Sequence, residues 1–181
     1  MRRRAMRVAM VVGLGVLFAS PLAAQMQSWK DVQVADLVTM KDKFVGLAGA
    51  FSEAPWEYEP MDGVRSTKEV FALMIAETHM FPVAWGYQPP AGAAAGFGPE
   101  MQRVNALTRE QIMAQLGPSF DHMIGILRGM DDAKRNESSS YFGRQMPVHA
   151  NVATAMADMH EHLGQLIAYA RANRVVPPWS R

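Results

Sequence analysis

The chain has 181 residues, with 18 lysines and arginines against 17 aspartates and glutamates, and a formal net charge of +1 at pH 7. This length is sufficient for one ordinary domain with a sizeable core. The sequence contains no cysteine, which excludes disulfides, thiolate nucleophiles and cysteine-based zinc sites.

The first 24 residues have the pattern of a secretory signal peptide. The basic stretch MRRRAMR precedes the apolar run VAMVVGLGVLFA, and SPLAAQ offers small residues for cleavage after Ala24. The apolar run is too short for a comfortable transmembrane helix, although an uncleaved membrane anchor is the alternative. We expect residues 1–24 to be a signal peptide, residues 25–181 to form one domain, and the protein to be exported, periplasmic or secreted, with no stable membrane anchor.

Cleavage would also change the charge of the protein. It removes four arginines and no acidic residue, so 14 basic residues remain against 17 acidic ones, a formal charge of −3. No basic run remains after residue 24, and we therefore expect no nucleic-acid binding. The 15 methionines in the chain favour a soft, adaptable core.

Two amphipathic helices are predicted in the first half of the chain, because apolar residues recur at intervals of three and four. The first covers residues 32–52. The second begins at Ser66, which forms an S-x-x-E capping box with Glu69, and Pro82 ends or kinks it.

Two further helices are predicted in the second half. One begins at Thr108 with another capping-box pattern, and Gly117-Pro118 should kink it. The other opens near Pro147, which is tolerated in a first turn. The connections at residues 53–66, 86–100 and 131–145 are predicted to be irregular, the second being either a disordered crossover or a lid over a pocket. Four such helices without an alternating apolar segment predict an all-α four-helix bundle with a long crossover connection.

Five histidines are the main candidates for chemistry. Asp158 and His162 are four residues apart and can hold one ion from the same helix face. His160 lies two residues from His162, roughly 200° around the helix axis, so these two side chains cannot easily coordinate one ion together. His79, on the second helix, is the candidate third ligand. A hydrogen-bonded surface couple is the alternative role of the Asp158 and His162 pair, and a satisfied histidine near a helix end is that of His79.

Three other polar residues have weaker claims to a role. The apolar stripe places His122 beside the core. His149 falls in the first turn of the last helix, where the helix dipole disfavours a charged imidazole, so we expect a neutral structural residue. Glu161 is a candidate second-shell partner or general base, or a surface charge.

The segment HEHLGQLIAYARANRVVPPWS, residues 160–180, closely resembles the C-terminal signature of the DinB-like superfamily. PWEYEPMDGVRSTKEVF and YFGRQM resemble the second-helix entry and the segment ahead of the last helix in that family, so the resemblance covers about residues 32–180. It implies a four-helix bundle with an unusual connection order that is often a homodimer. It also implies a divalent ion, such as zinc or nickel, held by one histidine on the second helix and an H-x-x-x-H pair on the last. Some members transfer or isomerise substrates with a low-molecular-weight thiol.

The sequence departs from this family pattern at two of the three ligand positions. His162 matches the second histidine of the pair, but the first falls on Asp158. The second-helix histidine falls near Leu73 or Met74, neither of which is a suitable ligand. Either the site is repaired, with His79 or His160 as third ligand, or it is lost.

Two functions follow from these alternatives. The first is an exported divalent-metal-dependent hydrolase or transferase that acts on an unknown small molecule through a degenerate ligand set. Export counts against the thiol-dependent version, because such thiols work mainly inside the cell. The second is a non-catalytic bundle that binds a small apolar ligand or a protein partner, in which Gln165, Tyr169 and Arg171 are structural.

Overall fold

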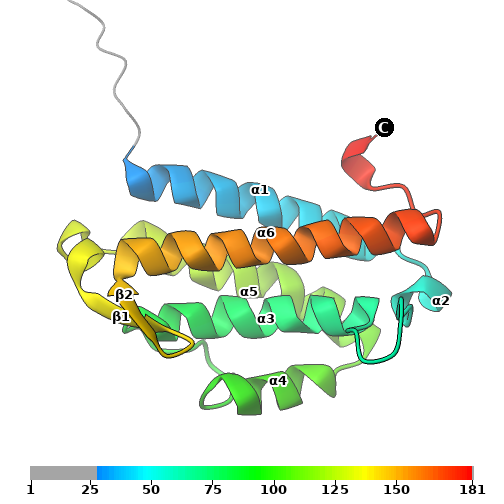
Figure 1. The fold of residues 1–181 in the computed structure, drawn as a ribbon, viewed down its shortest axis with the longest axis horizontal. Coiled ribbons are helices and arrows are strands. Elements are labelled where there is room, and N and C mark those ends of the chain that lie inside the picture. Colours follow the sequence, from blue (N-terminus) through cyan, green and yellow to red (C-terminus); the bar gives the residue numbers. More distant parts are fainter. Residues whose placement is uncertain (1–27, 181) are drawn as a thin grey trace, which may run out of the picture.

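The computed structural model describes residues 28–180, so the signal peptide predicted for residues 1–24 lies outside the described residues. Four long helices pack side by side along the length of the molecule (Figure 1). They are α1 (Trp29–Ala50), α3 (Thr67–Ala84), α5 (Arg109–Gly129) and α6 (Val148–Ala172). The predicted all-α four-helix bundle is therefore confirmed.

The connection order places α1 and α3 at opposite corners of the bundle. Both helices pack against α5 and against α6, which occupy the other two corners. The chain therefore crosses one end of the bundle between α1 and α3, in a segment that contains the short helix α2 (Glu53–Trp56).

Helix α3 is the most enclosed element of the described chain. It is covered by α5, α6, the shorter helix α4 (Phe97–Asn105) and strand β1 (Ser138–Tyr141). As a result every residue from Val70 to Pro82 is buried, including three polar residues in its middle: Glu77, Thr78 and His79. Burying a polar group costs free energy unless the group is paired. We therefore expect the helices that cover α3 to supply partners for these three residues.

The predicted helix starts are confirmed by their caps. The Ser66 hydroxyl accepts from the Glu69 N–H, and the Glu69 carboxylate accepts from the Ser66 N–H at 2.8 Å. Thr108 and Gln111 form the same reciprocal pair at the start of α5. Helix α3 ends at Ala84, two residues after Pro82, whereas α5 continues through Pro118 to Gly129.

All three connections predicted to be irregular contain regular structure, and the first, residues 53–66, contains α2. The crossover at residues 86–100 leads into α4, which begins at Phe97 and packs against α3. The segment 131–145 contains a 3₁₀ turn (Asp132–Asn136) and an antiparallel hairpin of β1 with β2 (Arg144–Pro147). Its two-residue turn has positive φ at Phe142 and Gly143, as in the tight turns that match strand twist. The prediction of irregular structure was therefore wrong in part at all three places.

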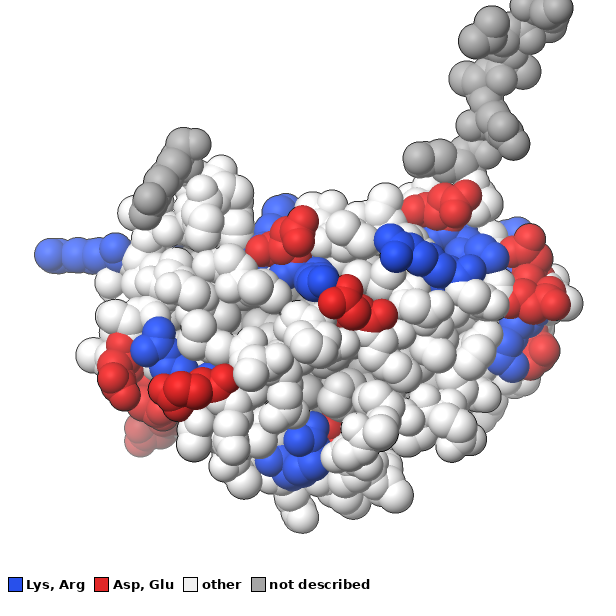
Figure 2. Space-filling view, turned by 180° about the vertical axis from the view of Figure 1, so that it is seen from behind, with Lys and Arg blue, Asp and Glu red and all other residues white. Residues whose placement is uncertain are grey.

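The surface of the described region carries charges of both signs. On the face shown in Figure 2, acidic and basic side chains are interspersed around a broad uncharged area. One ion pair, between Lys41 and Asp121 at 2.6 Å, joins α1 to α5. Within residues 28–180, none of the helices combines the length and the apolar character needed to cross a membrane.

Candidate metal site

Glu77, Asp158 and His162 form a compact cluster between α3 and α6. Each offers one ligand atom, and these three atoms lie within 4.8 Å of one another. His162 Nε2 lies 3.5 Å from a Glu77 oxygen and 3.8 Å from an Asp158 oxygen. The structure therefore brings together the pair found by its i,i+4 spacing, and the third member is Glu77, which sequence reasoning missed.

Glu77 is poorly satisfied in its buried position. Its side chain is 3% exposed, and its second carboxylate oxygen, Oε2, has no hydrogen-bond partner in the described part of the chain. Burial raises the pKa of Glu77 to about 7, and the nearby Asp158 adds to this while His162 opposes it. A buried carboxylate without full pairing is unfavourable unless it is protonated or binds a cation. A divalent ion therefore fits this donor set.

The tautomer of His162 is fixed by a chain of hydrogen bonds along α6. The Arg65 carbonyl can only accept, so the Tyr169 hydroxyl donates to it at 3.0 Å. The Tyr169 oxygen in turn accepts from Gln165 Nε2 at 2.7 Å. This turns Gln165 Oε1 toward His162 Nδ1, at 3.2 Å, and Nδ1 must then carry a proton.

This chain leaves His162 Nε2 facing the two carboxylates. In a neutral imidazole protonated on Nδ1, Nε2 holds the lone pair that a metal ion binds. In the absence of an ion, burial lowers the pKa of His162, but Glu77, Gln165 and Asp158 together outweigh burial and raise it overall. Binding a cation here would therefore release protons.

Tyr141 of β1 borders the same cluster. Burial raises the pKa of its phenol, and the neighbouring Asp158 and Glu77 carboxylates raise it further. The phenol consequently stays protonated at neutral pH and can donate a hydrogen bond or a proton to a bound molecule.

An apolar cavity of about 260 Å³ lies beside this cluster and shares Tyr141 with it. Met80 and Phe81 line the cavity one helical turn after Glu77, and Phe97 and Phe142 pack edge to face with ring centres 5.5 Å apart. A small molecule with an apolar part could thus occupy the cavity and reach the polar cluster at its edge.

The structure does not bring His79 or His160 to Asp158 and His162. His79 is two residues from Glu77 and so faces another side of α3, where its Nδ1 lies 2.8 Å from Glu100. His160 points toward α1 and lies 2.8 Å from Asp36, with its side chain 46% exposed. The structure therefore places neither residue in the cluster of Glu77, Asp158 and His162.

The family resemblance puts the second-helix histidine near Leu73 or Met74, which are buried core residues. The α3 residue that the structure brings to Asp158 and His162 is Glu77, about one turn later. A signal was present, because Glu77 is the single acidic residue in the apolar stretch VFALMIAETHMF. A lone acid in a helix that is apolar on all sides indicates either a buried pair or a ligand.

Two of the weaker candidates lie outside the cluster. His149 is half-buried, and its Nδ1 lies 3.0 Å from the Arg135 carbonyl. Glu161 is exposed on α6. We therefore assign neither residue to the cluster.

Comparison with known proteins places this arrangement in a known fold. No family model matches the sequence, and no curated protein matches it. Among solved structures, YjoA from Bacillus subtilis, a DinB-like protein, has 18% identity and a TM-score of 0.63, with 83% of this chain and 97% of YjoA covered. YfiT from Bacillus subtilis has 14% identity and a TM-score of 0.63, with 87% and 94% covered. The chain has the DinB-like fold.

Another structure with this fold is that of an enzyme whose reaction is named in its description. A mycothiol-dependent maleylpyruvate isomerase has 10% identity and a TM-score of 0.59, and the match covers 78% of this chain and 63% of the isomerase. YfiT is described as a probable metal-dependent hydrolase with an unusual four-helix bundle topology. In the present chain, two helices of the DinB-like fold supply the candidate ligands, Glu77 from α3 and the other two from α6.

Proposed function

We propose that the protein is a divalent-metal-dependent hydrolase or transferase whose ion is held by Glu77, Asp158 and His162. The observation that carries this proposal is the convergence of three ligand atoms within 4.8 Å in a largely buried position. It is supported by the unpaired Glu77 oxygen and by the hydrogen-bonded orientation of His162. The description of YfiT, which shares the fold, is consistent with it.

The chemical type of the three donor atoms indicates which ion the site prefers. The family resemblance implies zinc or nickel on three histidines, but here two of the three donors are carboxylates. Carboxylates suit harder ions, and a single imidazole still suits zinc. We therefore expect zinc or manganese to bind better than nickel.

The residues around the cluster have distinct roles in this proposal. A bound divalent ion supplies Lewis acidity and lowers the pKa of water. Glu77 and Asp158 supply negative charge that retains a cation, and Gln165 keeps Nε2 of His162 directed at it. The Tyr141 phenol donates a hydrogen bond to a developing negative charge on the substrate. The apolar cavity excludes water and holds the apolar part of the substrate.

A second function is favoured by the same cavity. Its lining is almost entirely apolar and includes Phe81, Phe97 and Phe142, which is the composition expected for a site that simply binds a small apolar ligand. In that case binding of the ligand would not depend on a metal ion. Export of the protein, with cleavage after Ala24, is a further part of the proposal that rests on the first 24 residues alone.

Metal content separates the two functions. The protein is purified without chelators or a histidine tag, incubated with zinc, nickel or manganese, dialysed, and measured by elemental mass spectrometry. His162→Gln should contain about one ion per chain less than the parent, because it removes the imidazole ligand. The matched control is His160→Gln, which changes a histidine outside the cluster and should retain the parent content.

Equal metal content in the parent and in His162→Gln would refute the metal site. A loss of metal in His162→Gln would justify screening ester, amide and thiol-dependent transfer substrates with the parent, with His162→Gln as the inactive reference.

A further inference from the structure

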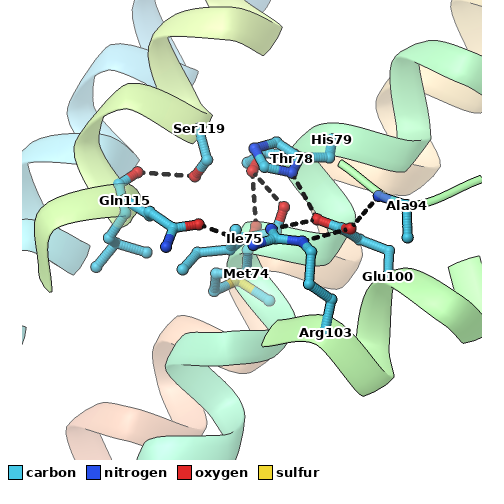
Figure 3. Close-up of polar contacts among 10 residues, drawn as sticks. Met74, Ile75, Thr78, His79, Ala94, Glu100, Arg103, Gln115 and Ser119 are labelled. Atoms are coloured by element: carbon cyan, nitrogen blue, oxygen red, sulfur yellow. Dashed lines mark hydrogen bonds and ion pairs between the residues drawn. The ribbon is translucent and has the colours of Figure 1, made fainter. Parts of the chain in front are cut away.

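A second polar cluster lies between α3, α4 and α5, on another side of α3 from Glu77 (Figure 3). At its centre is Glu100, which is fully buried. Arg103 donates to both of its carboxylate oxygens, at 2.6 and 2.8 Å, and the Ala94 N–H donates to one of them at 2.7 Å. Burial would raise the pKa of Glu100, but these donors and His79 outweigh it and lower the pKa to about 2.

This anchored carboxylate fixes the orientation of His79. Glu100 is ionised and can only accept, so His79 Nδ1, at 2.8 Å, carries a proton and donates to it. In the neutral imidazole the lone pair is then on Nε2, which makes no hydrogen bond to any residue of the described chain. A carboxylate behind one ring nitrogen and a free lone pair on the other is the arrangement of a metal-binding histidine.

A second imidazole approaches from α5. The ring centres of His122 and His79 are 6.2 Å apart, with the rings nearly perpendicular. His122 Nε2 is sealed from solvent and has no hydrogen-bond partner within the described residues. Burial lowers the pKa of both histidines, and each is therefore neutral at pH 7.

His79 and His122 line a cavity of about 230 Å³ together with Gln115 and Ser119 of α5. Ser119 lines it from α5, and Figure 3 shows the His79 ring between Glu100 and the Ser119 side. The Ser119 hydroxyl donates to the Leu116 carbonyl at 2.8 Å, and its oxygen keeps its lone pairs. Two imidazoles and one hydroxyl therefore line the cavity.

We propose that His79 and His122 bind a divalent transition-metal ion of the nitrogen-preferring kind, such as zinc or copper, in this cavity. Neutral imidazole is a preferred ligand of these ions. An ion about 2.0–2.1 Å from one nitrogen of each ring would put the ring centres roughly 5–6 Å apart, close to the observed separation. Water fills the remaining coordination positions, because the cavity is wider than the ion.

The electrostatics of the cluster permit a cation. Arg103 is a positive charge close enough to lower the pKa of His79. It is paired with Glu100 through two hydrogen bonds and with the Gln115 side-chain oxygen through a third, at 3.1 Å. A purely structural role explains the contact between His79 and Glu100, which ties α4 to α3. It does not explain the unpartnered Nε2 of His122 or the open cavity between the two rings.

The test uses a background in which the Glu77 cluster is disabled. His162→Gln protein, without a histidine tag, is titrated with zinc at pH 7.5 by calorimetry and by histidine ring NMR. We expect about one zinc ion per chain to bind, with chemical-shift changes at the ring nitrogens of His79 and His122. Adding His122→Gln should abolish this binding, whereas adding His160→Gln should leave it intact.

The cavity can also be blocked without removing a histidine. Ala114 also lines the cavity, and Ala114→Phe in the His162→Gln background should weaken zinc binding strongly, because the ring would fill the space beside the two imidazoles. Circular dichroism and thermal unfolding confirm that each variant folds. The proposal is overturned if His162→Gln binds no zinc, or if folded His162→Gln/His122→Gln protein binds zinc as well as its parent. Because the background lacks the first site, either result leaves the proposed function to be judged separately.

Discussion

The side-chain oxygen of Gln165 lies 3.2 Å from Nδ1 of His162, and this contact decides which nitrogen of the imidazole faces Glu77. The direction of the contact is set one helical turn further along α6, where Tyr169 donates to the Arg65 carbonyl and so accepts from Gln165. The last helix therefore orients the His162 nitrogen that faces the two carboxylates through its own side chains.

Gln165→Ala should lower metal affinity about 10- to 100-fold, because the imidazole loses the acceptor that fixes its tautomer. Tyr169→Phe should act in the same direction, since the Gln165 amide is then free to turn over. Competition with a chromophoric chelator measures both effects. Gln102→Ala, at an exposed glutamine on α4, is the matched control. Unchanged affinity in Gln165→Ala would contradict the orienting role.

The metal-free protein should lose stability as the pH rises from about 4.5 to about 7. Burial raises the pKa of Glu77 from 4.5 to about 7, so the folded state binds more protons than the unfolded state in this range. The raised pKa of His162 acts in the same direction, because its contribution is full below pH 6.5 and is lost as the pH rises through the folded value.

Melting temperatures between pH 5 and pH 8, in the presence of a chelator, test this expectation. Glu77→Gln should flatten the decline and be more stable than the parent at pH 8, because no buried carboxylate is ionised. The control is Glu161→Gln, at an exposed position on α6, whose melting temperatures should decline with pH as those of the parent do. A Glu77→Gln curve parallel to that of the parent would show that Glu77 does not titrate in this range.

Glu100→Ala should destabilise the protein by about 3 kcal/mol, because it leaves buried polar groups on α3 and α4 without their partner. Urea denaturation measures the change in the free energy of unfolding, and Glu57→Ala at an exposed site is the control. A loss below about 1 kcal/mol, in the range of surface pairs, would mean that the network does not anchor α4.

Each helix cap should contribute about 1 kcal/mol. Ser66→Ala and Thr108→Ala each remove a hydroxyl that accepts from a backbone N–H in the first turn. Thr39→Ala, at an exposed position inside α1, should cost less. If the two cap variants unfold at the same urea concentration as Thr39→Ala, the caps do not define these helix starts in solution.

Filling the apolar cavity should weaken the binding of apolar molecules. Ala84 lines this cavity, and Ala84→Phe would occupy much of its volume of about 260 Å³. Fluorescence of an anilinonaphthalene sulfonate probe should fall relative to the parent and to Ala106→Phe, a control at an exposed position. Equal fluorescence in all three proteins would indicate that the probe does not use the cavity.

The parts of the structure that were predicted from the sequence depend on local patterns. The four long helices follow from apolar periodicity and capping boxes, both of which act over a few residues. The pairing of Asp158 with His162 likewise follows from their spacing on one helix. Helix α4 was missed because its start is rich in glycine and proline, and the hairpin because its strands are short and polar.

The parts that were missed depend on packing between helices. The lone acid Glu77 in an apolar stretch is a local signal, but its partners are defined only once α6 is placed against α3. Likewise, nothing local shows that His79 belongs with Glu100 rather than with His162. His79, two positions from Glu77 on the same helix, has the side chain expected of a ligand, but it faces Glu100 of α4 and not His162. Which face of a wholly buried helix meets which partner is a tertiary property.

Glu77 and His79 extend from different sides of one enclosed helix, so α3 contributes a side chain to both clusters. A small rotation of α3 about its axis that moves Glu77 toward α6 displaces His79 in the opposite direction, because the two side chains lie on different sides of the helix. If an ion binds at each proposed site, we expect occupancy of one to bias the position of α3 that the other experiences. By thermodynamic reciprocity, the factor by which an ion at one cluster changes affinity at the other is the same in both directions.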